Sequence, residues 1–148
     1  MRQRTAILLI GVIFTVGLSL VVGVGVVDVS AADTLVVDQN GTAEYSSIQT
    51  AIDDASAGDT VEIRPGTYAE TIVVDKNITV TAPDGATLNG TDVENPDVGV
   101  TIGNDESYEA RNVAPTIRGV TVTRYETGIQ SRTHGDWVVD DVTVRTVQ

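Results

Sequence analysis

The chain lacks cysteine, and it has very little lysine, histidine or methionine. Among its 148 residues there is no Cys, one Met, one His and a single lysine, Lys76. Without cysteine there are no disulfide bonds, so burial of apolar side chains and backbone hydrogen bonds must hold the fold together. Cysteine and histidine are also the usual ligands of transition metals, so the sequence predicts no such metal site.

Charge of one sign dominates the chain. It carries 21 acidic against 9 basic residues, a formal net charge of −12, and the acids are spread along the sequence. An acidic surface with so little lysine is typical of a halophilic protein, whose self-repulsion is screened by salt. An ordinary acidic secreted protein is the alternative interpretation. Either way, the charge argues against nucleic-acid binding, which needs clustered Lys and Arg.

The N-terminus has the features of an export signal. Two arginines precede Thr5–Val27, which carries no charge and as a helix would be about 34 Å long, enough to cross a bilayer. Small residues at Val29–Ala32 suit a signal peptidase. We therefore expect residues 1–32 to be a signal peptide or, if uncleaved, a membrane anchor. Residues 33–148 then form one extracellular or cell-surface domain that contacts the membrane only through this segment.

One amphipathic helix is expected near the start of this domain. Ser46 and Gln49 have the spacing of a capping box, in which two side chains satisfy backbone groups at a helix start. Apolar side chains follow at helical spacing, and Gly58 stands where a helix stop is expected. The pattern predicts a helix over Ser46–Ala55 with one apolar side.

The rest of the domain alternates like short strands separated by turns. Pro65-Gly66 is one such turn. Apolar positions recur every 22 residues, a spacing typical of a solenoid. They are Ile78 and Val80, Val98, Val100 and Ile102, Val120 and Val122, and Val142 and Val144. We predict an all-β fold, a parallel β-helix of four or five coils with inward valine ladders and Asp140-Asp141 at a corner.

A family resemblance agrees with this pattern. The run Tyr45-x-x-Ile-Gln-x-Ala-Ile-x-x-Ala55, followed by Pro65-Gly66-x-Tyr68-x-Glu70, resembles the opening of right-handed parallel β-helix proteins of the pectin-lyase-like class. It is most similar to the N-terminal part of pectinesterases. The resemblance implies a right-handed β-helix with parallel β-helix (PbH1) repeats and an N-terminal helical cap. It does not imply an activity, because many non-enzymatic surface proteins open in the same way.

Catalytic residues are only weakly indicated. Pectinesterases use paired carboxylates, glutamines and an arginine on central coils, and nothing after Asn89 matches them. Polysaccharide lyases of the same fold use an acidic calcium site and a basic residue. The weak candidates for such groups are Asp136, Asp140, Asp141 and Arg124, and calcium is the cofactor that such an acidic site would bind. The alternative is a solvated acidic turn.

Ligand-binding and modification sites are also candidates. Tyr68, Tyr125 and Trp137 could stack on a sugar ring, although packing at a coil edge is the alternative. The only histidine, His134, reads as a turn residue. Three N-x-T sequences predict a glycoprotein modified at Asn40, Asn77 and Asn89.

The chain ends inside a strand pattern at Val142–Gln148, which predicts an uncovered β-edge. We expect further coils or another chain there. The leading functional hypothesis is a secreted or cell-surface protein that binds glycans or other surface polymers, such as polysaccharides, without catalysis. The alternative is a carbohydrate-active enzyme, pectinesterase-like or lyase-like, whose catalytic coils lie beyond this chain.

Overall fold

A computed structural model describes residues 31–104 and 112–146, which belong to one compact unit, residues 31–148. The expected export segment lies almost wholly outside these ranges, and so does most of the loop expected over 104–114. Within the two ranges, no helix has both the length and the apolar character that a bilayer crossing requires.

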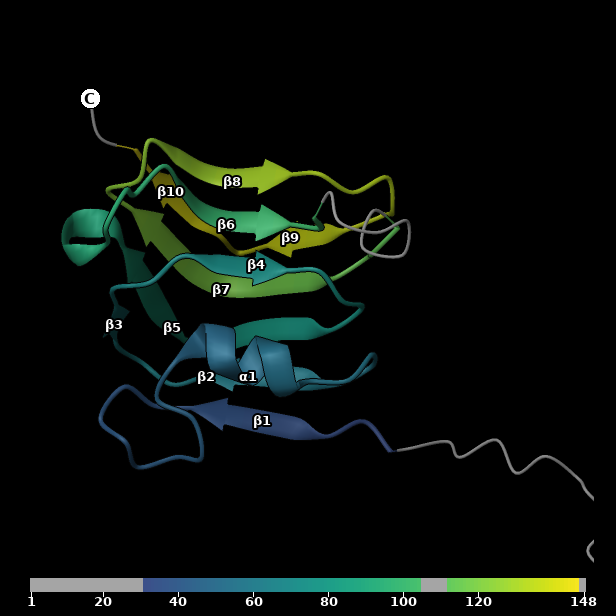
Figure 1. The fold of residues 1–148 in the computed structure, drawn as a ribbon. Coiled ribbons are helices and arrows are strands. Elements are labelled where there is room, and N and C mark those ends of the chain that lie inside the picture. The colour runs from purple at the N-terminus through teal and green to yellow at the C-terminus, as the bar shows by residue number, and fades with distance from the viewer. Residues whose placement is uncertain (1–30, 105–111, 147–148) are drawn as a thin grey trace, which may run out of the picture. The chain divides into compact units, whose positions relative to one another are not determined.

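This unit is built mostly of β-strands, with one short α-helix (Figure 1). The predicted all-β class is therefore confirmed. The elements in chain order are β1 Thr34–Val37, α1 Ile48–Asp54, β2 Thr60–Ile63, β3 Thr67–Tyr68, β4 Ile72–Val74, β5 Thr79–Asn89, the 3-10 turn η1 Gly90–Asp92, β6 Val98–Ile102, β7 Thr116–Thr123, β8 Thr127–Ser131, β9 Val138–Asp140 and β10 Thr143–Arg145.

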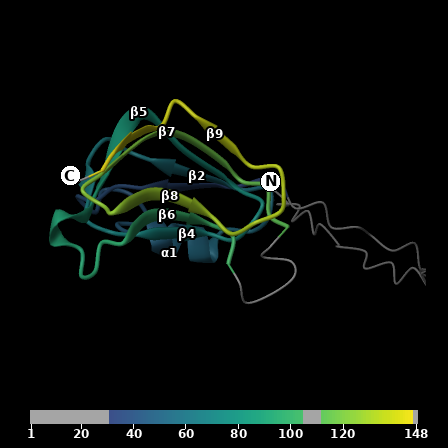
Figure 2. The same ribbon diagram turned by 90° about the horizontal axis from the view of Figure 1, so that it is seen from above.

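The strands pair in parallel in two sheets. The seven-stranded sheet has the order β1-β2-β5-β7-β10, with β3 also on β5 and β9 also on β7. The three-stranded sheet has the order β4-β6-β8. Parallel neighbours cannot be joined by a tight hairpin. From β3 to β9 the chain therefore alternates between the two sheets, whereas β1 and β2 are joined through α1. Figure 2 shows β4, β6 and β8 lying across from β2, β7 and β9.

The predicted 22-residue repeat holds only in the last strands. Val122 pairs with Val144, as the repeat requires. Val80, however, pairs with Ile117, and Val100 lies in β6 of the other sheet. The alignment of Ile78 with Val100, and of Val80 with Ile102, was therefore wrong. The segments 90–97 and 103–115 lengthen the path from β5 to β7, so equal sequence spacing does not place residues in the same sheet.

Helix α1 forms where the apolar stripe predicted it, but its cap is one residue later than expected. Ser47, not Ser46, is the N-cap, and its side chain accepts a hydrogen bond from the Thr50 N–H at 3.4 Å. The helix runs from Ile48 to Asp54 and buries Ile48, Ala51 and Ile52. Gln49 is not part of a capping box, because its side chain bonds to β4 instead.

The core lies between the two sheets and under α1. Buried and partly exposed residues alternate along the strands, as in β2, where Val61 and Ile63 are buried. Each inward side chain stacks on that of the paired strand, so that Val61, Val80 and Ile117 form a continuous ladder across β2, β5 and β7. Inward apolar ladders therefore exist, but this one does not have the members that the 22-residue repeat predicted.

The seven-stranded sheet bends at a column of residues with left-handed backbone. Ala86 pairs with Val120, so the residues before them, Gly85 and Gly119, are neighbours, with φ of 81° and 69°. The register of β7 with β10 puts Asp141, with φ of 50°, next in the column. Asp141 lies between β9 and β10, as the predicted corner requires.

Candidate functional site

Helix α1 closes the exposed edge of the three-stranded sheet. The edge strand β4 turns the N–H and C=O of Val73 toward the helix, and the Gln49 side chain meets both. The Val73 N–H donates to Gln49 Oε1 at 2.7 Å, and Gln49 Nε2 donates to the Val73 carbonyl at 3.4 Å. A side-chain amide offers the same donor and acceptor as a peptide group. Gln49 therefore takes the place of a neighbouring strand.

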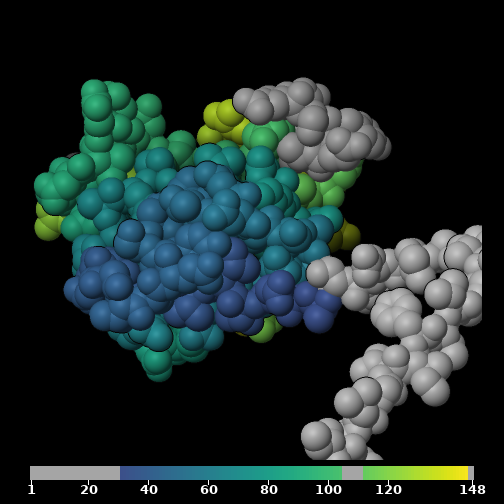
Figure 3. All heavy atoms as spheres, turned by 60° about the horizontal axis from the view of Figure 1, so that its bottom comes forward, coloured from purple at the N-terminus to yellow at the C-terminus, as the bar shows by residue number. Residues whose placement is uncertain are grey.

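Two charged side chains from the segment around β4 hold the ends of this helix. At its N-terminus, the Glu70 carboxylate accepts hydrogen bonds from the Ser47 hydroxyl at 2.8 Å and from two first-turn N–H groups at 3.0 and 3.1 Å. At its C-terminus, the Lys76 ammonium donates to the carbonyls of Ile52 and Ala55 at 3.0 and 2.9 Å. Both charges have the sign that the helix dipole favours. Figure 3 shows the first described residues of the unit, coloured purple to blue, on the face turned toward the viewer.

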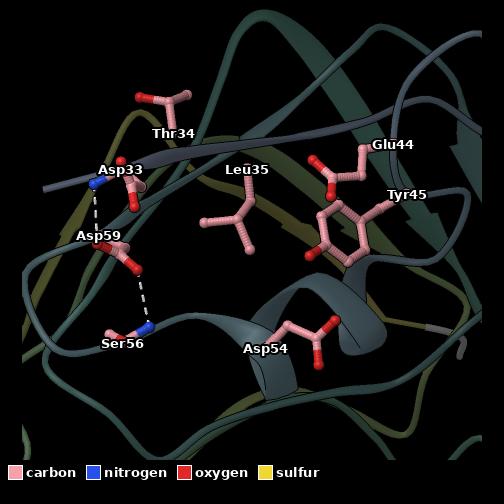
Figure 4. A pocket seen from close by; sticks show the side chains of 8 residues that line it. All are labelled: Asp33, Thr34, Leu35, Glu44, Tyr45, Asp54, Ser56 and Asp59. Atoms are coloured by element: carbon pink, nitrogen blue, oxygen red, sulfur yellow. Dashed lines mark hydrogen bonds between the residues drawn. The ribbon is translucent and has the colours of Figure 1, made fainter.

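A polar pocket of about 370 Å³ lies beside the helix (Figure 4). Strand β1, the chain before α1, the end of α1 and the turn after it all contribute. The lining residues are Asp33, Thr34, Leu35, Glu44, Tyr45, Asp54, Ser56 and Asp59. One wall is therefore a tyrosine ring, the floor carries a leucine, and the rest is carboxylates and hydroxyls.

Asp59 fixes one side of this pocket. It is only 8% exposed, and its two oxygens accept hydrogen bonds from the Asp33 N–H at 2.9 Å and the Ser56 N–H at 2.8 Å. These two backbone bonds, Asp33 first, hold the pKa of Asp59 below its ordinary value against the opposing effect of desolvation. Asp59 therefore stays ionised and ties the start of β1 to the end of α1, so it is not suited to act as a general acid.

Tyr45 forms the opposite side. Its backbone is bridged to β1, since Asp38 N–H donates to the Tyr45 carbonyl at 2.8 Å and Tyr45 N–H donates to the Val36 carbonyl at 3.3 Å. Desolvation, followed by a hydrogen bond to Asp54, raises the pKa of Tyr45. The ring is half-buried and stands near Glu44 and Asp54 (Figure 4). An aromatic face beside fixed hydrogen-bond acceptors can hold a ligand that has both C–H faces and O–H or N–H donors.

The predicted aromatic ligand-binding residues are not brought together. Tyr68 and Tyr125 are 3% and 1% exposed. Their hydroxyls donate to the carbonyls of Arg64 at 3.0 Å and Glu70 at 2.6 Å, so both residues hold the core and offer no free ring face. Trp137 alone of the three is exposed, at 39%.

Sequence reasoning missed the pocket tyrosine. In the sequence, Tyr45 stands out only as the first residue of the family-like run, directly after Glu44. The signal that could have found it is an acidic residue and a tyrosine next to a helix start. That signal is weak, because Asp33 and Asp59 reach the same pocket only through the fold.

The weak catalytic candidates lie around β7, β9 and β10. Asp140 is 3.6 Å from Arg118, with both side chains more than half exposed. Asp141 and Arg124 have left-handed backbone, with φ of 50° and 64°, and Asp136 is an exposed residue before β9. Among the described residues, no group of three or more His, Cys, Asp or Glu side chains is placed to hold a metal ion such as calcium.

The three predicted glycosylation residues differ in how their side chains are bound. Asn40 Nδ2 donates to Asp38 Oδ1 at 3.1 Å in an exposed loop. Asn77 Oδ1 accepts the Ala114 N–H at 2.7 Å, and Asn89 Oδ1 accepts the N–H of the residue two positions on at 3.1 Å. Modification at these positions stays a prediction. His134 is exposed, as a turn residue would be.

Comparison of the chain with protein-family models, with curated proteins and with solved structures found no match.

Proposed function

We propose that residues 33–148 form a right-handed parallel β-helix of the pectin-lyase-like type with PbH1 repeats, exported behind residues 1–32 to the cell surface or the medium. Three series of parallel pairs support the winding: β1, β2, β5, β7 and β9; β3, β5, β7 and β10; and β4, β6 and β8. A chain that passes through three faces in turn produces this pairing. The left-handed column at Gly85 and Gly119 is the corner between the first two faces.

We infer that the protein binds a glycan without cleaving it, and that the pocket beside Tyr45 is the binding site. The observation that carries this is that one half-buried tyrosine ring and four carboxylates line a single pocket, with Asp59 fixed by two backbone hydrogen bonds. Carboxylates accept hydrogen bonds from sugar hydroxyls, and a tyrosine ring packs on the apolar face of a sugar. Asp59, held ionised by backbone N–H groups, supplies a rigid acceptor rather than a proton.

The charge of the pocket narrows the glycan class. Asp33, Glu44, Asp54 and Asp59 all line it, so a uronate polymer would bring like charge to a site that is already acidic. Neutral sugars and amino sugars meet no such repulsion, and an ammonium group is attracted. The proposed ligand is therefore a neutral or amino-sugar polymer, unlike the acidic polymer on which pectinesterases act.

The test is a binding titration of the full chain against neutral, amino-sugar and uronate oligosaccharides, followed by calorimetry or tyrosine fluorescence. We expect binding of the first two classes, and a loss of about five- to thirtyfold in affinity in Y45A, since one stacked ring contributes on the order of 1–2 kcal/mol. The control is W137A, which removes an exposed aromatic side chain that does not line the pocket and should leave the affinity unchanged.

Two outcomes would contradict the proposal. If Y45A binds as tightly as the wild type while W137A does not, the site lies elsewhere. If binding is accompanied by turnover, seen as new reducing ends, new unsaturated ends or released methanol, the protein is a carbohydrate-active enzyme of the pectinesterase or lyase type.

A further inference from the structure

The paired strands of the two sheets form a stack that runs from β1, β4 and α1 at one end to β8, β9 and β10 at the other. The exposed apolar surface lies at the second end. Among the described residues, the large hydrophobic side chains that are exposed are Trp137 at 39%, Val138 at 46% and Val144 at 44%. All three lie in or beside β9 and β10. The opposite end of the stack, under α1, has none among these residues. We call this surface, formed by β8, β9, β10 and Trp137, the open end.

Backbone groups at the open end also face outward. The Val138 N–H donates to the Pro115 carbonyl at 3.0 Å, so Val138 turns its backbone toward β7. Likewise the Arg145 carbonyl accepts the Arg124 N–H at 3.1 Å. Because successive residues of a strand turn their backbone groups to opposite sides, Val139 and Val144 direct theirs away from β7. No strand in residues 31–104 or 112–146 pairs with that side.

The charge of the molecule is divided unevenly between the two ends. Residues 31–76, which form β1, α1, β2, β3 and β4, contain nine acidic and two basic residues, whereas residues 112–146 contain four of each. Two copies that approach through their α1 ends would bring two strongly acidic surfaces together. Two copies that approach through their open ends would bring together charge-balanced surfaces and keep the acidic ones apart.

We propose that the open end is a self-association surface, at which two copies of this chain meet about a two-fold axis. Each copy would cover the other's Trp137, Val138 and Val144, and the outward backbone groups of β9 and β10 would gain partners. A two-fold arrangement uses the same surface on both copies and therefore closes as a dimer. A head-to-tail arrangement would instead place an open end on an acidic α1 end and would extend without limit.

The first test measures the mass of the full-length chain by light scattering over a range of concentrations. We expect twice the mass of the 15.6 kDa chain, and a single-chain mass for the double variant V138K/V144K. The matched control S46K/T50K adds the same two charges at exposed residues near α1 and should keep the doubled mass. Circular dichroism confirms that each variant is folded.

A wild-type chain of single mass at every concentration would overturn the proposal. So would a doubled mass that persists in V138K/V144K or is lost equally in S46K/T50K.

The second test uses the absence of cysteine, because a single introduced thiol has no competing partner. V138C alone should form a disulfide-linked dimer under mild oxidation, at a rate at least tenfold above that of T50C alone. Efficient cross-linking between V138C and T50C in a mixture, with little in either variant alone, would show a head-to-tail contact and contradict the two-fold axis.

Discussion

Val73 and Val144 each lie in an edge strand, β4 of the three-stranded sheet and β10 of the seven-stranded sheet, and their surroundings are opposite. Each turns a backbone N–H and C=O away from its own sheet. At Val73 both groups meet the Gln49 side chain, and α1 covers the strand. At Val144 no described residue is paired with them, and the side chain is 44% exposed.

The difference shows what is needed to end a stack of parallel strands. At the α1 end, three side chains replace a whole strand: Gln49 satisfies the edge, while Glu70 and Lys76 hold the helix at its two termini. At the open end the strands leave apolar side chains exposed and carry balanced charge. The first arrangement leaves no free edge for another strand, whereas the second leaves a strand edge that another chain can pair with.

The largest effect on stability is expected in the middle of the stack, where strands pack on both sides of a residue. A Cβ added at Gly119 would lie 2.2 Å from the Ala82 carbonyl oxygen, and the φ of Gly119 is 69°. G119A should therefore lower the free energy of unfolding by about 3 kcal/mol or more, from backbone clash and left-handed strain together. The control is G41A, where φ is 71° but nothing lies within 4 Å, so strain alone costs about 1 kcal/mol. Urea unfolding measures both, and equal losses would contradict this packing.

Removing the N-terminal anchor of the helix should be the next most costly change. E70A removes the carboxylate that accepts hydrogen bonds from the Ser47 hydroxyl and from two N–H groups of the first helical turn. It should lower the free energy of unfolding by about 2–3 kcal/mol. The comparison variant at the open end is D140A, whose exposed pair with Arg118 contributes about 0.5 kcal/mol or less. Chemical denaturation of both variants tests the contrast between the ends, and a D140A loss as large as that of E70A would refute it.

The C-terminal anchor should matter less. K76M keeps much of the apolar stem but removes an ammonium that donates to three helix carbonyls, those of Ile52, Asp53 and Ala55. We expect a loss of about 1–2 kcal/mol, because water can reach part of this end. K76R, which retains the charge and the donors, should recover at least half of it in the same measurement.

Low pH should destabilise the fold at the α1 end, through Asp38 after β1. Hydrogen bonds from Thr42 first, then from the Asn40 backbone, with Arg64 contributing, lower the pKa of Asp38 from 3.8 to about 2. Because the folded value is depressed, its stabilisation is complete above pH 3.8 and is lost as the pH falls toward 2. The midpoint of urea unfolding should therefore fall over that range, and by less in T42V. An equal fall in both proteins would show that Asp38 is not responsible.

The smallest effect on stability is expected at Asp141, the last residue of the column of left-handed residues that includes Gly85 and Gly119. Asp141 has φ of 50°, a conformation that glycine adopts without strain. D141G should leave stability unchanged or raise it by up to about 1 kcal/mol. Thermal unfolding measures this, and the same variant should keep glycan binding. A clear loss of binding in D141G would instead support a functional role for the acidic residues near β9.

The sequence predicted those parts of the fold that depend on local pattern. The apolar stripe of α1 and the alternation of strands such as β2 are read directly from neighbouring residues. The N-cap could not be chosen between Ser46 and Ser47, because Glu70, which lies far along the chain, selects Ser47. The repeat failed at Val100 because the turns between β5 and β7 differ in length from those that follow.

The candidate site was beyond the sequence for a related reason. The pocket joins Asp33, Tyr45 and Asp59, which come from three separate segments. Tyr68 and Tyr125 were proposed from residue type alone, yet they face the core. Whether a tyrosine stacks on a ligand or packs inside depends on its place in the sheets, which composition does not reveal.

Amide hydrogen exchange at two protein concentrations tests the central contrast most directly. The Val73 amide, bonded to Gln49, should be protected to the same degree at both. The Val139 and Val144 amides should exchange quickly when the protein is dilute, and at least tenfold more slowly when it is concentrated and the open ends pair. Rapid exchange at Val73, or exchange at Val139 and Val144 that does not depend on concentration, would contradict an account in which one end is closed and the other binds its copy.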